Sequence, residues 1–98
     1  MSELVYMYNN NGDLVETIYI CNGKKNGRYA RYCPSGQIVE ICTYIDGMKQ
    51  GVYKTFWSNG EIETYCLYVD DKLHGEYKKY YSNGELQIKQ NYENGILI

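Results

Sequence analysis

Four cysteines and a single histidine are the side chains of this sequence best suited to hold a metal ion or form a disulfide. A structural zinc site commonly uses cysteine pairs only two to four residues apart, and no cysteine pair here has that spacing. Unbridged cysteines are more often small buried side chains. We therefore expect no metal site and interpret the cysteines as core residues. The five side chains are Cys21, Cys33, Cys42, Cys66 and His74.

The acidic residues and the histidine do not form a pattern typical of catalysis. Asp46, Asp70 and Asp71 could suggest calcium ligands, but the EF-hand loop pattern is absent, and such residues commonly form turns. His74 occupies the turn position that Asn26 and Gln50 fill elsewhere, and a general base needs positioned partners. We therefore predict no catalytic residue and no cofactor, and we expect that the protein is not an enzyme.

Glycines at a fixed interval of 24 residues indicate the elements that carry these side chains. Self-similarity at one period marks a repeat architecture. The large apolar residues follow the same interval, and together they define four copies, at about 3–26, 27–50, 51–74 and 75–98, in one domain spanning 1–98. The two clearest series are Gly12, Gly36, Gly60 and Gly84, and Gly27, Gly51 and Gly75.

Each copy predicts one β-hairpin, because two runs rich in aromatic and β-branched residues flank an Asn-Gly or Ser-Gly turn. No window has helical periodicity. The sequence therefore predicts an all-β fold, a single-layer or curled antiparallel meander of about eight strands built from four 24-residue hairpins. A two-residue Asn59-Gly60 loop would place Trp57 opposite Ile62 and Gly51 opposite Tyr68.

One face of this sheet, the core face, carries Tyr29, Tyr53 and Tyr77 together with Cys42 and Cys66. The two cysteines hold the same repeat position, so one strand separates them and their Cα atoms should lie roughly 9.5 Å apart. A disulfide needs Cα atoms within about 7 Å, so we expect no bridge between them.

The opposite face, the second face, is apolar in the middle of the chain and polar in the last copy. A thin sheet cannot bury both faces by itself, so we expect this surface to contact another protein chain. The candidate interaction residues are Ile41, Ile45, Phe56, Tyr65, Leu67 and Val69, with the terminal Ile96, Leu97 and Ile98. The terminal residues either fold over the second face, dock on another protomer, or extend their own sheet.

Composition argues against two classes of partner. The net charge is -2, the mean hydropathy is -0.57, and no basic stripe accompanies the 13 tyrosines. A stacking platform for single-stranded nucleic acid needs such a positive groove, so we expect no nucleic-acid partner. The acidic balance also disfavours anionic membranes. We expect a cytoplasmic protein, in the cytoplasm of the host cell if the source is a virus.

The repeat unit resembles the MORN-repeat variant, as found in bacterial and giant-virus proteins and in proteins labelled YwqK-type antitoxins. It is carried by "GRYARYCPSGQIVEICTYIDGMKQG", "GVYKTFWSNGEIETYCLYVDDKLHG" and "GEYKKYYSNGELQIKQNYENG", with a weaker first copy, "VYMYNNNGDLVETIYICNGKKNG". The departures from the pattern are Cys33-Pro34-Ser35 at one turn and Asp71 in place of glycine at another.

The resemblance implies an elongated, groove-like sheet of hairpins that serves as a scaffold or binds proteins, with members that often dimerise through the repeats. Together with the apolar second face, it leads us to expect a non-enzymatic repeat scaffold that mediates protein–protein interaction and self-associates as a homodimer. The alternative implied by the resemblance is an antitoxin-like inhibitor that binds a cognate toxin.

Overall fold

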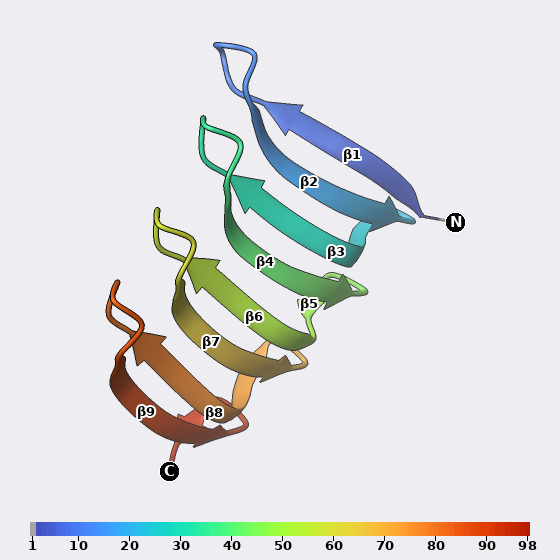
Figure 1. Ribbon diagram of the computed structural model, residues 1–98. Coiled ribbons are helices and arrows are strands. Elements are labelled where there is room, and N and C mark those ends of the chain that lie inside the picture. Colours follow the sequence, from blue (N-terminus) through green and yellow to red (C-terminus); the bar gives the residue numbers. More distant parts are fainter. Residues whose placement is uncertain (1) are drawn as a thin grey trace.

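The computed structural model describes residues 2–98 as one antiparallel sheet (Figure 1). The strands are β1 (Glu3–Tyr8), β2 (Leu14–Cys21), β3 (Lys24–Tyr32), β4 (Ile38–Ile45), β5 (Met48–Lys49), β6 (Gly51–Phe56), β7 (Ile62–Val69), β8 (Lys72–Tyr80), β9 (Leu86–Glu93) and β10 (Ile96–Leu97). They lie in chain order across the sheet, with β5 paired to β4. The prediction of an all-β hairpin meander is confirmed.

Residues 2–98 form ten strands where about eight were expected, and the repeat explains both additions. β5 and β6 are one repeat strand interrupted at Gln50, since the equivalent β3 and β8 are continuous. β10 is the beginning of a strand that would open another copy, because its residues hold the positions of Lys72 and Leu73 one copy earlier. The last residues thus extend their own sheet, and the Ile98 N–H donates to the Asn91 carbonyl at 2.9 Å.

The turn at the tip of each hairpin is longer than the two-residue loop expected for Asn59-Gly60. The Gly60 N–H donates to the Trp57 carbonyl at 2.9 Å, and the Trp57 N–H donates to Glu61 at 2.8 Å. Only Gly60 in this loop has positive φ, at 89°. This pattern is a type I turn followed by a left-handed glycine, with three loop residues.

The links between hairpins are the turns that use two residues with positive φ. Asp46 and Gly47 have φ of 51° and 83°, and the flanking Ile45 and Met48 pair directly. These are the features of a type I′ turn, which suits the twist of antiparallel strands. All four tips lie along one side of the sheet and the links along the other (Figure 1).

The longer tip turn changes the register beside it. Phe56, not Trp57, pairs with Ile62, and a β-bulge separates this pair from Thr55 and Thr64. The prediction that Trp57 faces Ile62 is therefore wrong, because the extra residue in β7 moves Ile62 to the second face. The predicted pairing of Gly51 with Tyr68 is confirmed.

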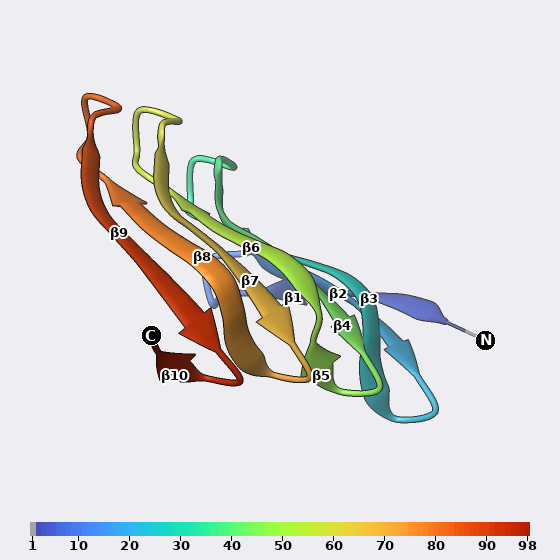
Figure 2. The ribbon, with the colours of Figure 1, turned by 90° about the horizontal axis from the view of Figure 1, so that it is seen from below.

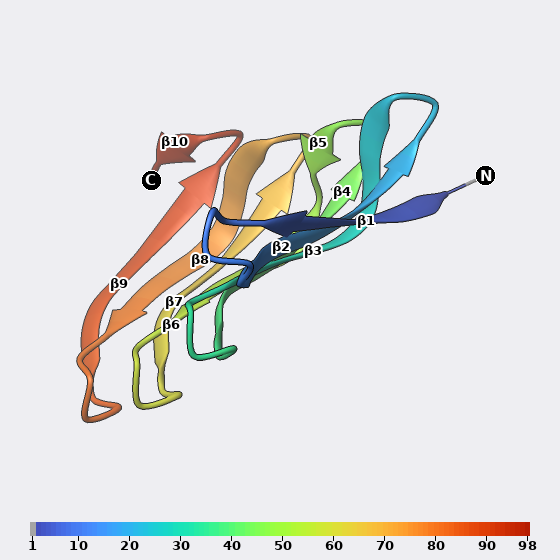
Figure 3. The ribbon, with the colours of Figure 1, turned by 90° about the horizontal axis from the view of Figure 1, so that it is seen from above.

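A second irregularity lies where each link returns into the sheet. Gly27 has φ of 132° and stands in a bulge opposite Tyr19, whose Cβ would lie 3.0 Å from a Cβ added at residue 27. Gly51 and Gly75 hold the equivalent positions with φ of 87° and 93°. Bulges increase the local twist and bend of a strand. The strands accordingly curve along their length (Figures 2 and 3).

The core forms on one face of the sheet, where tyrosines from the two strands of one hairpin meet edge to face. The ring centroids of Tyr53 and Tyr68 are 5.6 Å apart with an interplanar angle of 71°. Lys49 folds over both rings, with its Nζ 5.0 Å from each centroid. The same arrangement joins Tyr29 to Tyr44 under Lys25 and, without a lysine, Tyr77 to Tyr92.

Full burial is confined to few side chains. Ile18 and Cys66 are 1% exposed, and Cys42 and Tyr29 are also buried. The Cα radius of gyration is 14.7 Å, whereas a compact domain of this length has about 12.6 Å. The molecule is therefore a thin, curved sheet, with extents of 38 × 31 × 17 Å, that carries its core on one face. Residues 2–98 include no helix that could span a membrane.

The bulge glycines give a matched pair of variants. Gly51→Ala should cost about 1–2 kcal/mol of unfolding free energy, because the residue keeps a positive φ that side chains resist, although its Cβ would meet open space. Gly27→Ala should cost more, since its Cβ also meets Tyr19. Urea unfolding of both variants and of the wild type measures the difference, and equal losses would contradict the steric role given to Tyr19.

Candidate functional site

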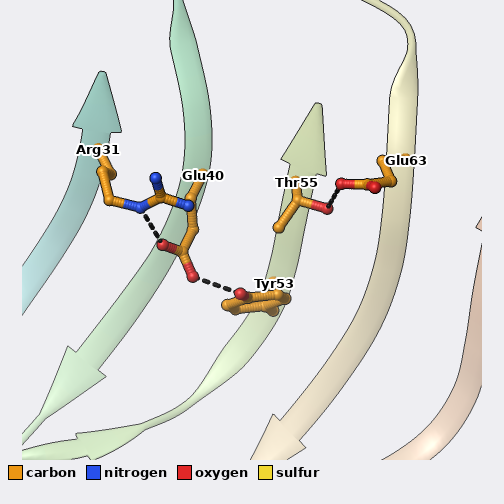
Figure 4. Close-up of polar contacts among 5 residues, drawn as sticks. All are labelled: Arg31, Glu40, Tyr53, Thr55 and Glu63. Atoms are coloured by element: carbon orange, nitrogen blue, oxygen red, sulfur yellow. Dashed lines mark hydrogen bonds and ion pairs between the residues drawn. The ribbon is translucent and has the colours of Figure 1, made fainter. Parts of the chain in front are cut away.

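The polar groups of the core face are satisfied within the sheet (Figure 4). Arg31 Nε donates to Glu40 Oε1 at 2.8 Å, and the Tyr53 hydroxyl donates to the other oxygen of the same carboxylate. Thr55 donates to Glu63 at 3.1 Å. Among the described residues, no buried side-chain nitrogen or oxygen lacks a hydrogen-bond partner. The network joins three neighbouring strands and is suited to hold them in register.

Burial and the hydrogen-bond network together determine the pKa values of the ionisable groups on this face. Desolvation opposes ionisation of Glu40, but its hydrogen bonds with Tyr53 and Arg31 outweigh the burial and lower the pKa of Glu40. Burial and then the bond to Glu40 raise the pKa of Tyr53. Burial also raises the pKa of Tyr44 to about 12 and that of the Cys66 thiol to about 11. At neutral pH these groups are therefore a carboxylate among neutral phenols and thiols, with no activated nucleophile.

The two buried cysteines lie where the repeat predicted. Cys42 and Cys66 stand on β4 and β7 with β6 between them, since Tyr53 pairs with Cys66 and Tyr29 with Cys42. His74 makes a more specific contact than expected of a turn residue. Its Nδ1 accepts the Asn94 N–H of the next link at 3.4 Å, as Asn26 Oδ1 accepts the Asp46 N–H at 3.2 Å. Residues 2–98 contain no group of three potential metal ligands close enough to hold an ion.

The second face is hollowed into a groove, and we call this hollow the second-face groove. One part, of about 480 Å³, spans β3, β4 and β6, and a neighbouring part, of about 340 Å³, reaches the tip of the third hairpin. The two parts share Ile38 and Ile41. Phe56 and Trp57 line the second part, so its walls are largely apolar.

Positive charge borders the apolar groove. Arg28 and Lys54 line its larger part together with hydroxyl groups, and no carboxylate lines either part. Arg28 makes no ion pair within the described chain, residues 2–98. The ladder of pairs from Lys54 through Tyr65 to Lys78 and Lys89 continues this charge across the sheet, with Glu76 bridging the last two lysines. A chain of net charge -2 thus presents a cationic second face.

The structure separates the predicted interaction residues into three places. Ile41 and Phe56 line the groove. Tyr65 and Leu67 lie beside it on β7, because Tyr65 pairs with Lys54 and Leu67 with Val52. Ile45 and Val69 are exposed at the links, away from the groove, and the terminal Ile96, Leu97 and Ile98 are exposed on or beside β10 at the sheet edge.

Sequence reasoning missed four residues that shape this surface. The two-residue tip loop expected from the sequence would place Ile38 and Trp57 on the core face, whereas the longer turn brings both to the second face. Arg28 and Lys54 carried no motif of their own, and only the folded sheet brings these cations beside Ile41. The second-face position of Ile38 is visible in its pairing with Tyr32 across the bulge.

Two stretches of the chain, residues 49–70 and 73–94, match the family model of the MORN repeat variant. Both stretches are MORN repeats. No curated protein and no solved structure gave a significant match to the chain. MORN repeats generally build non-enzymatic scaffolds that bind proteins or membranes.

The matched MORN repeats run from β5 through β9, so they include the tyrosine pairs of the last two hairpins and Lys49, which lies over the first of these pairs. The first two hairpins lie outside the match but have the same tip turns, with the Gly12 N–H bonded to Asn9 and the Gly36 N–H to Cys33. The resemblance recognised in the sequence is thus confirmed for the MORN repeat itself.

Glu40 gives a pH-dependent test of the core-face network. Because the pKa of Glu40 is lowered in the folded state, its contribution to stability is complete above the unfolded pKa and is lost as pH falls through the folded one. Glu40→Gln should therefore cost about 1–2 kcal/mol at neutral pH and progressively less in acid. Urea unfolding across this pH range measures the difference, with Glu85→Gln at an exposed tip as the control. A pH-independent loss would contradict the charged network.

Proposed function

We propose that this protein is a non-enzymatic scaffold that binds a partner protein through the second-face groove. The observation that carries the proposal is the groove around Ile38, Ile41, Phe56 and Trp57, an apolar hollow on a sheet that has no second layer. Exposed apolar patches rimmed by polar residues commonly mark protein interaction sites. The scaffold role that is general among MORN repeats supports the same proposal.

The two faces of the sheet differ in the groups that they leave free to contact a partner. The core face uses its tyrosines, lysines and Glu40 in contacts with one another, so it has few groups left to offer a partner. The second face combines apolar walls with Arg28 and Lys54, which line the groove without a carboxylate beside them. Membrane binding also uses cations, but a hollow fits an inserted protein segment better than it fits a flat lipid surface.

The chemistry of the groove specifies the partner segment. The apolar side chains of the partner segment would fill the hollow between Ile38 and Phe56, and the carboxylates of the segment would approach Arg28 and Lys54. Arginine binds carboxylates through two parallel hydrogen bonds, which adds orientation to attraction. The partner therefore presents an acidic segment with apolar anchors. Such complementarity mainly accelerates association and selects among partners.

Two isoleucines at opposite ends of β4 provide a matched test. Ile38 lines the groove and is 44% exposed, whereas Ile45 stands at a link and is 51% exposed. Both should tolerate glutamate without unfolding, as circular dichroism can verify. Ile38→Glu should weaken capture of the partner from a native lysate by about 30-fold, equivalent to about 2 kcal/mol, because it removes an apolar contact and places a charge in the hollow. Ile45→Glu should leave capture unchanged.

Equal capture by both variants would reject the groove as the binding site. Loss with Ile45→Glu alone would move the site to the links.

The charge requirement has its own test. Arg28→Glu should reduce the rate of association with the captured partner and weaken its dependence on salt, because the rim then repels an acidic segment. Surface plasmon resonance at two ionic strengths measures both quantities. Lys24→Glu, at an exposed link, is the control of equal charge change. If Arg28→Glu leaves the association rate unchanged, the partner does not bind through an acidic segment at this rim.

A further inference from the structure

The first strand leaves an apolar edge open. β1, with the sequence ELVYMY, contains one charge and no proline, glycine or lysine. Tyr6 and Tyr8 are 53% and 61% exposed on one side, and Met7 is 43% exposed on the other. Within residues 2–98, β1 pairs only with β2, so the backbone groups of its outer edge have no strand opposite them. Long apolar edges of this kind recruit further strands.

The opposite edge of the sheet carries the usual protections. Lys89, Asn91 and Glu93 alternate along β9, and Gln90 stands where Cys66 and Cys42 stand in earlier copies. β10 also covers part of the outer backbone of β9, through the pairs of Ile96 with Glu93 and Leu97 with Tyr92. Charged residues and a short covering strand both prevent edge-to-edge association. The two edges therefore differ in their readiness to accept a partner.

The repeat specifies what the open edge can accept. In the three later copies, the same edge of the equivalent strand pairs with an antiparallel strand: β3 with β2, β6 with β4, and β8 with β7. An incoming antiparallel strand therefore fits β1. β9 of a second molecule is disfavoured, because it would bring Lys89 and Gln90 against apolar Tyr6 and Val5 and because β10 obstructs part of it.

A second β1 fits this edge on both faces. A two-fold axis perpendicular to the sheet makes the two strands antiparallel and keeps their core faces on the same side. With Val5 on the axis, Glu3 meets Met7 and Leu4 meets Tyr6; with Tyr6 on the axis, Glu3 instead meets Asn9. No like charges oppose one another in either register, and aromatic or aliphatic side chains meet across the pair, which stabilises such ladders.

We propose that two copies of this chain pair antiparallel through β1 and form a closed dimer with one sheet running through both. The contact is isologous, so it uses the open edge of each copy and leaves only the protected β9–β10 edges at the ends. Growth therefore stops at two copies. The second-face groove remains free, and the axis places both grooves on the same side of the continuous sheet. A partner with two acidic segments would then bind with avidity.

The mass of the full chain in solution tests the dimer. Light scattering and native mass spectrometry should give twice the 11.5 kDa of one chain. The double variant with Tyr6→Lys and Tyr8→Lys places positive charges on the contact strand, against Leu4 or against the same lysine of the second copy, and it should raise the dimer dissociation constant by at least about tenfold. Tyr81→Lys with Ile96→Lys, at the other end of the sheet, should remain dimeric.

A monomeric wild type would overturn the proposal, and so would a dimer that survives the lysines on β1. Dimer loss in Ile38→Glu but not in the β1 variant would show that the copies meet through the groove instead.

Amide hydrogen exchange of the wild type tests the pairing through β1 without any variant. Dilution through the dissociation constant should expose the β1 amides to exchange while β3–β8 keep their protection. Unchanged protection of β1 on dilution, or new exchange centred on β4 and β6, would reject pairing at the β1 edge.

Discussion

A single layer of strands has no second layer against which to bury a core, and the rest of this structure follows from that constraint. The sheet instead bends each strand at a glycine with positive φ, at Gly27, Gly51 and Gly75. The bend lets the residue that follows each link, such as Lys49, lie over a pair of tyrosines. Aromatic rings supply large apolar area and a favourable edge-to-face contact, and a cation above them adds to it. Each of the last three hairpins thus carries its own tyrosine pair, and the buried cluster of Ile18, Tyr29 and Cys42 joins the first hairpin to the second.

This way of building a core leaves the two faces with different roles. On the core face, Glu40 joins Arg31 and Tyr53 across neighbouring strands, so polar groups hold the register of the sheet. The second face has no such internal network around Arg28, and its apolar side chains line a hollow. The contacts proposed with other chains therefore lie on this face and on the β1 edge. The polar side chains of the fourth hairpin limit this contact surface at the β9 end of the sheet, as polar terminal units of repeat arrays commonly do.

The sequence predicted the hairpins and most of the core because tyrosines and glycines recur with one period, and period and turn chemistry are local properties. It misplaced Ile38 and Trp57 because a Ser-Gly or Asn-Gly pair suits both a two-residue turn and a three-residue one. Pro34 was the available signal: a proline fits the second position of a type I turn but lacks the N–H that a paired strand residue would donate. The cationic rim of the groove was not predictable from the repeat, since Arg28 and Lys54 hold different repeat positions and meet only through strand pairing.

The contacts between successive links make the sheet weakest toward tension applied across its strands. Each link donates one backbone N–H to the strand that follows the preceding link, as Gly47 does to Lys25 and Gly95 does to Leu73. The two ends of the chain belong to opposite edges of the sheet (Figure 1). Tension applied between the two ends would break the hydrogen bonds between neighbouring strands one after another, as in a zipper, and would not shear many of these bonds at once. Each 24-residue unit released in this way adds up to about 80 Å of extended chain, so the protein is built to yield in equal steps under load.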